Sequence, residues 1–237
     1  MRLQILQEVV LIQKLMQSTF SLHHKDIVEG NPQVGDFLER WPALRVQTQV
    51  FAEFHRITNV NLRSQFYCEL DRHTPKLVAL YREKATKTGK TAEALRDILR
   101  VYDCQEQVDV DMKRILTLRA LPVYLREDGS QFFKTFCRED EPDISDTPVA
   151  LLTLVTEDAS AAVHFNAVNT SVVVEDEIVV GDLPRLTDAL VLCFGLFYAL
   201  HLNYPQQLIN TFTFIQKMVM CLDDATFPIG ELKLKFL

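Results

Sequence analysis

Two runs of apolar residues near the C-terminus recur at the spacing of a helix. Their members, at alternating intervals of four and three, are Leu186, Leu190, Cys193, Phe197 and Leu200, followed by Leu208, Phe212, Ile215, Val219 and Leu222. This spacing places each run along one face of a helix. Asn203 and Pro205, between the runs, suit a helix end and a first helical position. The pattern therefore predicts a buried helical hairpin over 183–202 and 205–222.

The length of these runs and the residues around them decide whether the two helices form a free-standing coiled coil or part of a protein core. Each run covers little more than two heptads, which is too short for a free-standing coiled coil. Phe194, Leu196, Tyr198 and Leu202 make the first helix apolar on nearly every side. We therefore expect the first helix to be the central core element, with the second helix the more exposed of the two.

The first half of the chain shows helical spacing throughout. It predicts a helix over 3–17 with a broad apolar face and a short helix over 31–40 with Pro32 in its first turn. Further helices are expected from Val46 to Ile57, from Leu62 to a break at Thr74-Pro75, from there to Gly89, from Thr91 to Tyr102, and over 109–119. The first half is thus predicted to be an all-helical cluster.

Strand patterns begin in the second half. The apolar run Val149–Val155 favours a buried strand, although a run this short is also compatible with a helix. Ser171–Val174 and Ile178–Val180 flank the acidic turn Glu175-Asp176-Glu177, which predicts a β-hairpin. Shorter signals predict three other segments: a short strand at Pro122–Leu125, a helix capped by Ser130 that carries Phe132, Phe133 and Phe136, and an edge strand or docking segment at Glu231–Leu237.

Together these patterns predict a predominantly helical α+β fold. It has an N-terminal helical cluster, a small β-hairpin or sheet near 149–180 and the buried C-terminal helical hairpin. Because no linker rich in glycine, serine or proline interrupts the chain, we expect one compact unit over 1–237. Two tightly packed subdomains, an all-helical one over 1–105 and an α+β one over 106–237, are the alternative.

Composition narrows the class of protein. Hydrophobic residues make up 48% and charged residues 24% of the chain, which is ordinary for a soluble globular protein. A net charge of -7 argues against a protein whose whole surface binds nucleic acid. The longest apolar run, Ala189–Leu202, is shorter than the ~18–20 residues of a membrane span, and the N-terminus lacks the pattern of a signal peptide. We therefore expect no membrane association.

The five cysteines indicate the compartment. They are widely spaced and form no C-x-x-C pair. Their positions are Cys68, Cys104, Cys137, Cys193 and Cys221. An odd number of scattered cysteines is typical of reduced, core-type thiols. We therefore expect an intracellular protein, in the cytoplasm or the nucleus.

Motifs for catalysis, metal binding or cofactor binding are not evident in the sequence. The six histidines have no partners at metal-ligand spacing, and the seven glycines are too scattered for a phosphate-binding loop. Five carboxylates between Arg138 and Asp146 lack the ligand spacing of a calcium loop and favour an exposed loop. We expect no catalytic residue, no metal, no cofactor and no small-molecule substrate.

Two surface features remain as candidate contact sites. Apolar residues at both ends of the chain are candidates for contact with a protein partner: Leu3, Leu6, Val10, Leu232, Leu234 and Phe236. A basic segment over 76–90, opposed only by Glu83, is a candidate for contact with an anion and contains Lys76, Arg82, Lys84, Lys87 and Lys90.

Several strings in the chain carry a resemblance to a known family. They are FAEFHRITNVNLRSQFYCELDRHTPKLVALYR, TLRALPVYLREDGSQFFKTF, LLTLVTED and ALVLCFGLFYALHLNYPQQLINTFTFIQKMV. Over about residues 40–222 the chain resembles the C-terminal region of fish sterile alpha motif domain-containing protein three-like sequences. The N-terminal interaction module that gives the family its name is not evident in residues 1–40. The resemblance implies no catalytic residues.

These observations favour a non-catalytic protein-interaction or scaffold domain of an intracellular vertebrate protein. Its partner is another protein or a second copy of the chain. One alternative is a nucleic-acid-associated protein of mobile-element origin that uses residues 76–90. A second alternative is an enzyme of a type that the motifs do not identify.

Overall fold

The computed structural model describes residues 2–138, 142–156, 161 and 163–222, with side chains from Glu8 onward. Its first half is helical, as predicted: α1 (Arg2–Ser18), α2 (Phe20–Gly30), α3 (Val34–Arg40), a 3₁₀ turn η1 (Pro42–Arg45), α4 (Gln47–Thr58), α5 (Leu62–Ala85), α6 (Lys90–Asp103) and α7 (Val110–Tyr124). The second half contains β1 (Phe133–Cys137), β2 (Val149–Val155), β3 (Asn169–Val174), β4 (Glu177–Leu183), α8 (Leu186–Ala199), η2 (Gln206–Leu208), α9 (Ile209–Phe214) and a π-helical turn η3 (Ile215–Val219). The predominantly helical α+β fold is confirmed.

The four strands form one sheet in the order β1-β2-β3-β4. β1 runs parallel to β2, whereas β2, β3 and β4 are antiparallel neighbours. β2 is buried on both faces, since Leu151 belongs to the main core while Ala150 and Leu152 pack with Val173 in a second cluster. Burial on both faces explains why β2 reads as an unbroken apolar run in the sequence.

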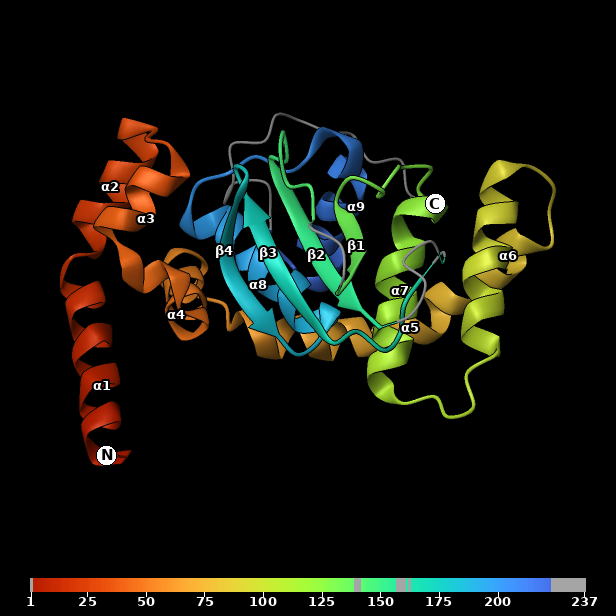
Figure 1. The fold of residues 1–237 in the computed structure, drawn as a ribbon, viewed down its shortest axis with the longest axis horizontal. Coiled ribbons are helices and arrows are strands. Elements are labelled where there is room, and N and C mark those ends of the chain that lie inside the picture. Colours follow the sequence, from red (N-terminus) through yellow and green to blue (C-terminus); the bar gives the residue numbers. More distant parts are fainter. Residues whose placement is uncertain (1, 139–141, 157–160, 162, 223–237) are drawn as a thin grey trace.

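Helix α8 is the centre of the fold. All fourteen of its residues are buried, and it packs against the sheet, α4, α5 and α7 (Figure 1). A Cβ on Gly195 would lie 2.8 Å from Leu62 Cδ2 and 3.0 Å from Val50 Cγ1, so glycine lets α8 approach α4 and α5 closely. The prediction of a central core helix is therefore confirmed.

The second helix of the predicted hairpin is interrupted and more exposed. Residues 206–219 divide into η2, the short α9 and η3, and Met218 is 44% exposed. The apolar positions predicted to be buried are nevertheless buried, and aromatic contacts such as Phe197 with Phe212 join this segment to α8. Glu127 accepts hydrogen bonds from the backbone N–H groups of Asn210 and Thr211, which caps the start of α9.

The predicted helix break at Thr74-Pro75 is wrong. α5 continues for 24 residues from Leu62 to Ala85 with Pro75 inside it. Proline removes the backbone donor that would bond to Asp71 O, and the Thr74 hydroxyl donates to Leu70 O at 2.8 Å in the turn before it. Packing against α6 and α7, which buries Leu70 and Tyr81, outweighs the local preference to break.

Other boundaries also differ from the prediction. Residues 122–124 end α7 instead of forming a strand, and Phe133 and Phe136 lie in β1 instead of a helix. Pairing of β1 with β2 is a long-range contact, which overrides the local pattern. The sequence reading also missed α2, and α3 begins after Pro32 instead of containing it.

The cysteines are less uniform than the predicted core-type thiols. Cys193 is buried in α8, where burial raises the pKa of its thiol. Cys68 on α5, Cys104 directly after α6 and Cys221 after η3 are exposed free thiols. The core-type description therefore holds for Cys193 and is wrong for these three.

Candidate protein-interaction surface

Helix α1 exposes apolar side chains on several of its sides. Val9, Val10, Leu11, Ile12 and Leu15 are each between 37% and 56% exposed. Along the described side chains of α1, from Glu8 to Ser18, Met16 is the one that is buried. A helix that is apolar all round is normally covered in a folded protein. In Figure 1, α1 extends away from the remaining elements with the N-terminus at its far tip.

Three leucines are the most exposed apolar side chains in the part of the chain that the structure describes. Leu11 is 56%, Leu15 54% and Leu22 62% exposed. Leu11 and Leu15, four residues apart, share one face of α1. α1 meets α2 at Thr19, whose N–H donates to Leu15 O at 2.9 Å and whose carbonyl accepts from His23 N at 3.0 Å. We call Leu11, Leu15 and Leu22 the outer stripe.

The base of α1 is fixed to α4 by a buried polar network. His23 Nε2 lies 2.8 Å from Glu53 Oε1, and both side chains are 1% exposed. Arg56 Nη1 donates to the other oxygen of Glu53 at 2.6 Å, and Arg56 Nε donates to Gln17 Oε1 at 2.9 Å. The Trp41 ring packs on His23 with 5.2 Å between centroids. The network holds the α1–α2 junction in place, while the outer stripe remains exposed.

The acidic turn of the β3–β4 hairpin holds α3 and η1. Glu175 accepts a hydrogen bond from the Val34 backbone N–H at 2.8 Å, at the start of α3. Arg45 Nη2 forms an ion pair with Glu177 Oε2 at 3.2 Å. A Cβ on Gly35 would lie 2.9 Å from Glu177 Oε1, so glycine leaves room for this carboxylate. Residues predicted only as a hairpin turn therefore also fix the N-terminal helices on the sheet.

The predicted partner-contact residues fall partly on this surface. Val10 is 49% exposed on α1. Leu3 and Leu6 lie on α1, in the part whose side chains are outside the described set. Leu232, Leu234 and Phe236, with the whole predicted segment 231–237, lie outside the described residues. The sequence analysis did not single out Leu11, Leu15 and Leu22, because the helical spacing of the N-terminal segment does not show which face stays exposed.

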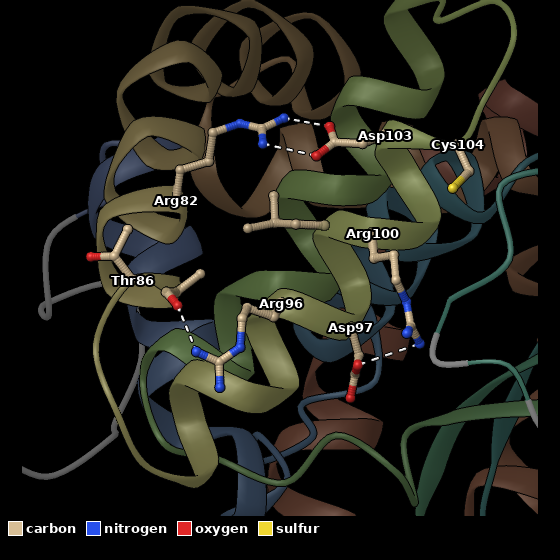
Figure 2. A pocket seen from close by; sticks show the side chains of 9 residues that line it. Arg82, Thr86, Arg96, Asp97, Arg100, Asp103 and Cys104 are labelled. Carbon is tan, nitrogen blue, oxygen red and sulfur yellow. Dashed lines mark hydrogen bonds and ion pairs between the residues drawn. The ribbon is translucent and has the colours of Figure 1, made fainter.

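The predicted anion-contact residues lie on α5 (Lys76, Arg82 and Lys84), in the loop that follows it (Lys87) and at the start of α6 (Lys90). Arg82 also lines an open groove between α5 and α6 (Figure 2). Arg82 donates to both oxygens of Asp103, at 3.0 and 2.6 Å, and this contact lowers the pKa of the Asp103 carboxyl. Arg96 Nη1 donates to the carbonyls of Ala85 and Lys87, at 3.0 and 3.2 Å. Lys76, Lys87 and Lys90 are exposed, and Lys84 is partly exposed. The groove therefore carries arginines that are engaged in intramolecular contacts, two of them with aspartates.

A third polar cluster joins α5 to the start of α8. Asp188, buried in the first turn of α8, accepts hydrogen bonds from Arg63 at 3.2 Å, Tyr67 at 2.8 Å and Arg185 at 2.8 Å. Burial, reinforced by the Asp188 carboxylate, raises the pKa of Tyr67 to about 12. The oxygens of Asp188 are thus occupied by its neighbours, and we assign this cluster to packing.

Residues 2–46 match the family model for sterile alpha motif domain-containing protein 3, helical domain. No curated protein and no solved structure matches the chain. The predicted resemblance to this family is confirmed at residues 2–46. The span over which it was predicted, about residues 40–222, lies almost entirely outside this match, and the first of the strings listed above begins at Phe51.

The residues that match this family model run from α1 through η1. It therefore contains the outer stripe, His23 of the buried network, and the residues that the β3–β4 turn holds. Within the part of the chain that the structure describes, no helix is long and apolar enough to cross a membrane, and no group of three or more acidic, histidine or cysteine residues is arranged to hold a metal ion.

Proposed function

We propose that this chain is a non-catalytic protein-interaction domain whose contact element is the outer stripe. One observation carries the proposal: Leu11, Leu15 and Leu22 are each more than half exposed, and Leu11 and Leu15 share one face of α1. Removing apolar surface from water is favourable by roughly 25 cal/mol per Å². Single exposed apolar residues are common, but an aligned set indicates a surface that another protein covers.

The attachment of α1 supports the same conclusion. A 17-residue helix is marginally stable by itself in water and depends on packing against a neighbour. Here the packing lies at the base, through Met16 and Gln17, and leaves the outer stripe available. The exposed thiols of Cys68, Cys104 and Cys221 further favour a reducing, intracellular setting, since exposed thiols persist there.

Site-specific photo-crosslinking tests this function. The chain is produced with p-benzoylphenylalanine at position 11 and irradiated in a cell lysate, with position 110 as a matched control. Val110 is 52% exposed but lies on α7, away from the outer stripe. We expect a covalent adduct with a protein from position 11 and none from position 110. Absence of an adduct from position 11, or equal adducts from both positions, contradicts the proposal.

The exposed basic residues around the α5–α6 loop favour one second candidate, contact with nucleic acid. Lys87 and Lys90 are exposed, and Lys84 is partly exposed. Backbone contacts of this kind are salt-dependent. If this candidate is correct, a fluorescent single-stranded RNA binds at low salt, and changing Lys84, Lys87 and Lys90 to Glu weakens binding at least tenfold. RNA binding that is absent at low salt, or unchanged in the triple variant, removes this candidate.

A further inference from the structure

We infer that the contact between α2 and α4 is a pH-sensitive latch, which is closed at neutral pH and opens on acidification to release α2 from α4. The latch consists of His23 on α2 with Glu53 and Arg56 on α4, and two further histidines, His24 and His201, lie beside it. Its opening changes how α1 and α2 are held on the body of the fold, whichever protein the outer stripe contacts.

The charges of the latch balance when His23 is neutral. Arg56 Nη1 donates to one oxygen of Glu53 at 2.6 Å, and His23 Nε2 lies 2.8 Å from the other oxygen. One carboxylate and one guanidinium therefore cancel, in a site where the side chains of His23 and Glu53 are each 1% exposed. A proton on His23 adds a second cation to this site, and an uncompensated charge is costly to bury.

The hydrogen bonds of His23 fit the same neutral state. A protonated imidazole has two N–H donors, whereas the neutral ring has one donor and one acceptor. Nε2 has a close acceptor in Glu53, but Nδ1 faces the Thr19 hydroxyl oxygen at 3.5 Å, which is too long for a strong hydrogen bond. From these contacts we assign the neutral tautomer with its proton on Nε2.

His24 brings a second titratable ring to the edge of the latch. It is partly buried and stacks on Phe20 with 5.2 Å between the ring centroids. Burial has the largest effect on His24 and lowers its pKa below the ordinary value of 6.5. The Glu53 carboxylate opposes this effect. His201, in the turn after α8, and His23 lower the pKa of His24 further.

The direction of the pH dependence follows from these shifts. Because the pKa of His24 is lower when α2 is attached than when it is free in water, the released form binds more protons as the pH falls below 6.5. The contribution of His24 to attachment is therefore complete above pH 6.5 and is lost as the pH falls through the pKa of the attached form. Protonation of His23 acts in the same direction, because a released imidazolium is hydrated and a buried one is not.

The other charged groups around α2 do not supply a second anion to the latch. Two ion pairs use their own charges, Arg40 with Asp26 and Lys25 with Glu29. From α1, the uncharged Gln17 contacts the latch, by accepting a hydrogen bond from Arg56. Within the described part of the chain, Glu53 is therefore the carboxylate that the two adjacent imidazoles share.

The latch carries much of the attachment of α2. His23 and Ile27 are the buried residues of this helix, so an open latch leaves one buried apolar side chain of α2 to hold it. The sheet and α8 are held by buried apolar side chains, which carry no proton-dependent charge near neutral pH. Acidification is therefore expected to loosen the N-terminal helices while the rest of the fold persists.

Tryptophan fluorescence tests the latch directly. Trp41 is the single tryptophan of the chain, and its ring packs on His23 with 5.2 Å between the centroids. As the pH is lowered from about 7.5 to about 5, we expect the emission of Trp41 to move to longer wavelength, with a midpoint below pH 6.5, while the far-ultraviolet circular dichroism stays nearly constant. The emission shift reports release of α2, and the constant dichroism shows that the helices remain folded.

Two variants identify the titrating group. His24→Gln leaves the contact of His23 with Glu53 in place and is expected to move the midpoint at least 0.3 pH unit lower. The matched control is His55→Gln, on the exposed side of α4, which is expected to leave the midpoint unchanged. Emission that is the same at both ends of the pH range overturns the inference. A midpoint that is equal in His24→Gln and the unmodified chain, or a parallel loss of the circular dichroism signal, overturns it as well.

Discussion

At the scale of single residues, the buried pair of His23 and Glu53 has the largest structural consequence. Both side chains are almost fully buried, and Glu53 also accepts from Arg56. Removing one member of a buried charged network leaves its partners without compensation. The pair is therefore the main polar attachment between α2, in the family-matched region, and α4.

Changing Glu53 to Ala tests this attachment. We expect a loss of about 3 kcal/mol in the free energy of unfolding, because the charged Arg56 and the buried His23 lose their acceptor. Urea denaturation followed by circular dichroism measures the loss. The matched control is Glu29→Ala, whose ion pair with Lys25 is about two-thirds exposed on both sides and is expected to cost under about 1 kcal/mol. Equal effects of the two changes contradict the assignment.

A second prediction at the scale of single residues concerns Gly195. A side chain at this position meets Leu62 and Val50 inside ordinary contact distance, and overpacking of a core costs about 1–3 kcal/mol. We therefore expect Gly195→Ala to lower the unfolding midpoint clearly. Gly30→Ala is the control, since its added Cβ would lie 3.7 Å from Pro32 Cδ, an ordinary contact. A stabilised Gly195→Ala variant is incompatible with the close packing of α8.

At the scale of elements, patterns set by local burial were predictable from the sequence. Strand β2 has the predicted bounds Val149–Val155, and the β3–β4 hairpin turns at the predicted acidic residues. Helix α8 was also predictable, because its apolar positions fill every side. In each of these elements, the residues that the apolar pattern predicts to be buried are buried in the structure.

Elements determined by distant contacts were not predictable in the same way. Pro75 signals a helix break locally, yet α6 and α7 hold α5 together across it. Residues 133–137 show no alternation that marks a strand, and they become one through pairing with β2. The outer stripe was missed because sequence alone does not reveal which face of α1 stays exposed.

Removing most of α1 is the prediction that belongs to this scale. Residues 1–14 precede the contacts of Met16, Gln17 and His23 with the body. We therefore expect the free energy of unfolding of a chain that begins at Leu15 to lie within about 1 kcal/mol of that of the unmodified chain, as for changes at exposed sites. Differential scanning calorimetry measures the effect. A large loss of stability indicates that α1 belongs to the core of the monomer.

At the scale of the whole molecule, the family-matched region and the remainder share one set of contacts. One cluster of buried apolar side chains runs from Met16 to Leu222. The His23–Glu53 pair and the Glu175 and Glu177 contacts join residues 2–46 to the elements that follow them. The body of the fold thus anchors the C-terminal end of α1, and the rest of α1 extends from the body (Figure 1). This leaves the exposed side chains of α1 accessible to a partner.

Hydrogen exchange of the α1 backbone amides tests the central claim most directly. A projecting helix that finds no cover opens readily, whereas a covered helix is protected. We predict that amides of residues 8–15 exchange at least tenfold more slowly in the presence of the protein captured at position 11 than in its absence, while amides of α8 remain unchanged. The Leu11→Asp variant is expected to abolish this difference. Exchange in α1 that is equally rapid with and without that protein, in the unmodified chain, would contradict the account.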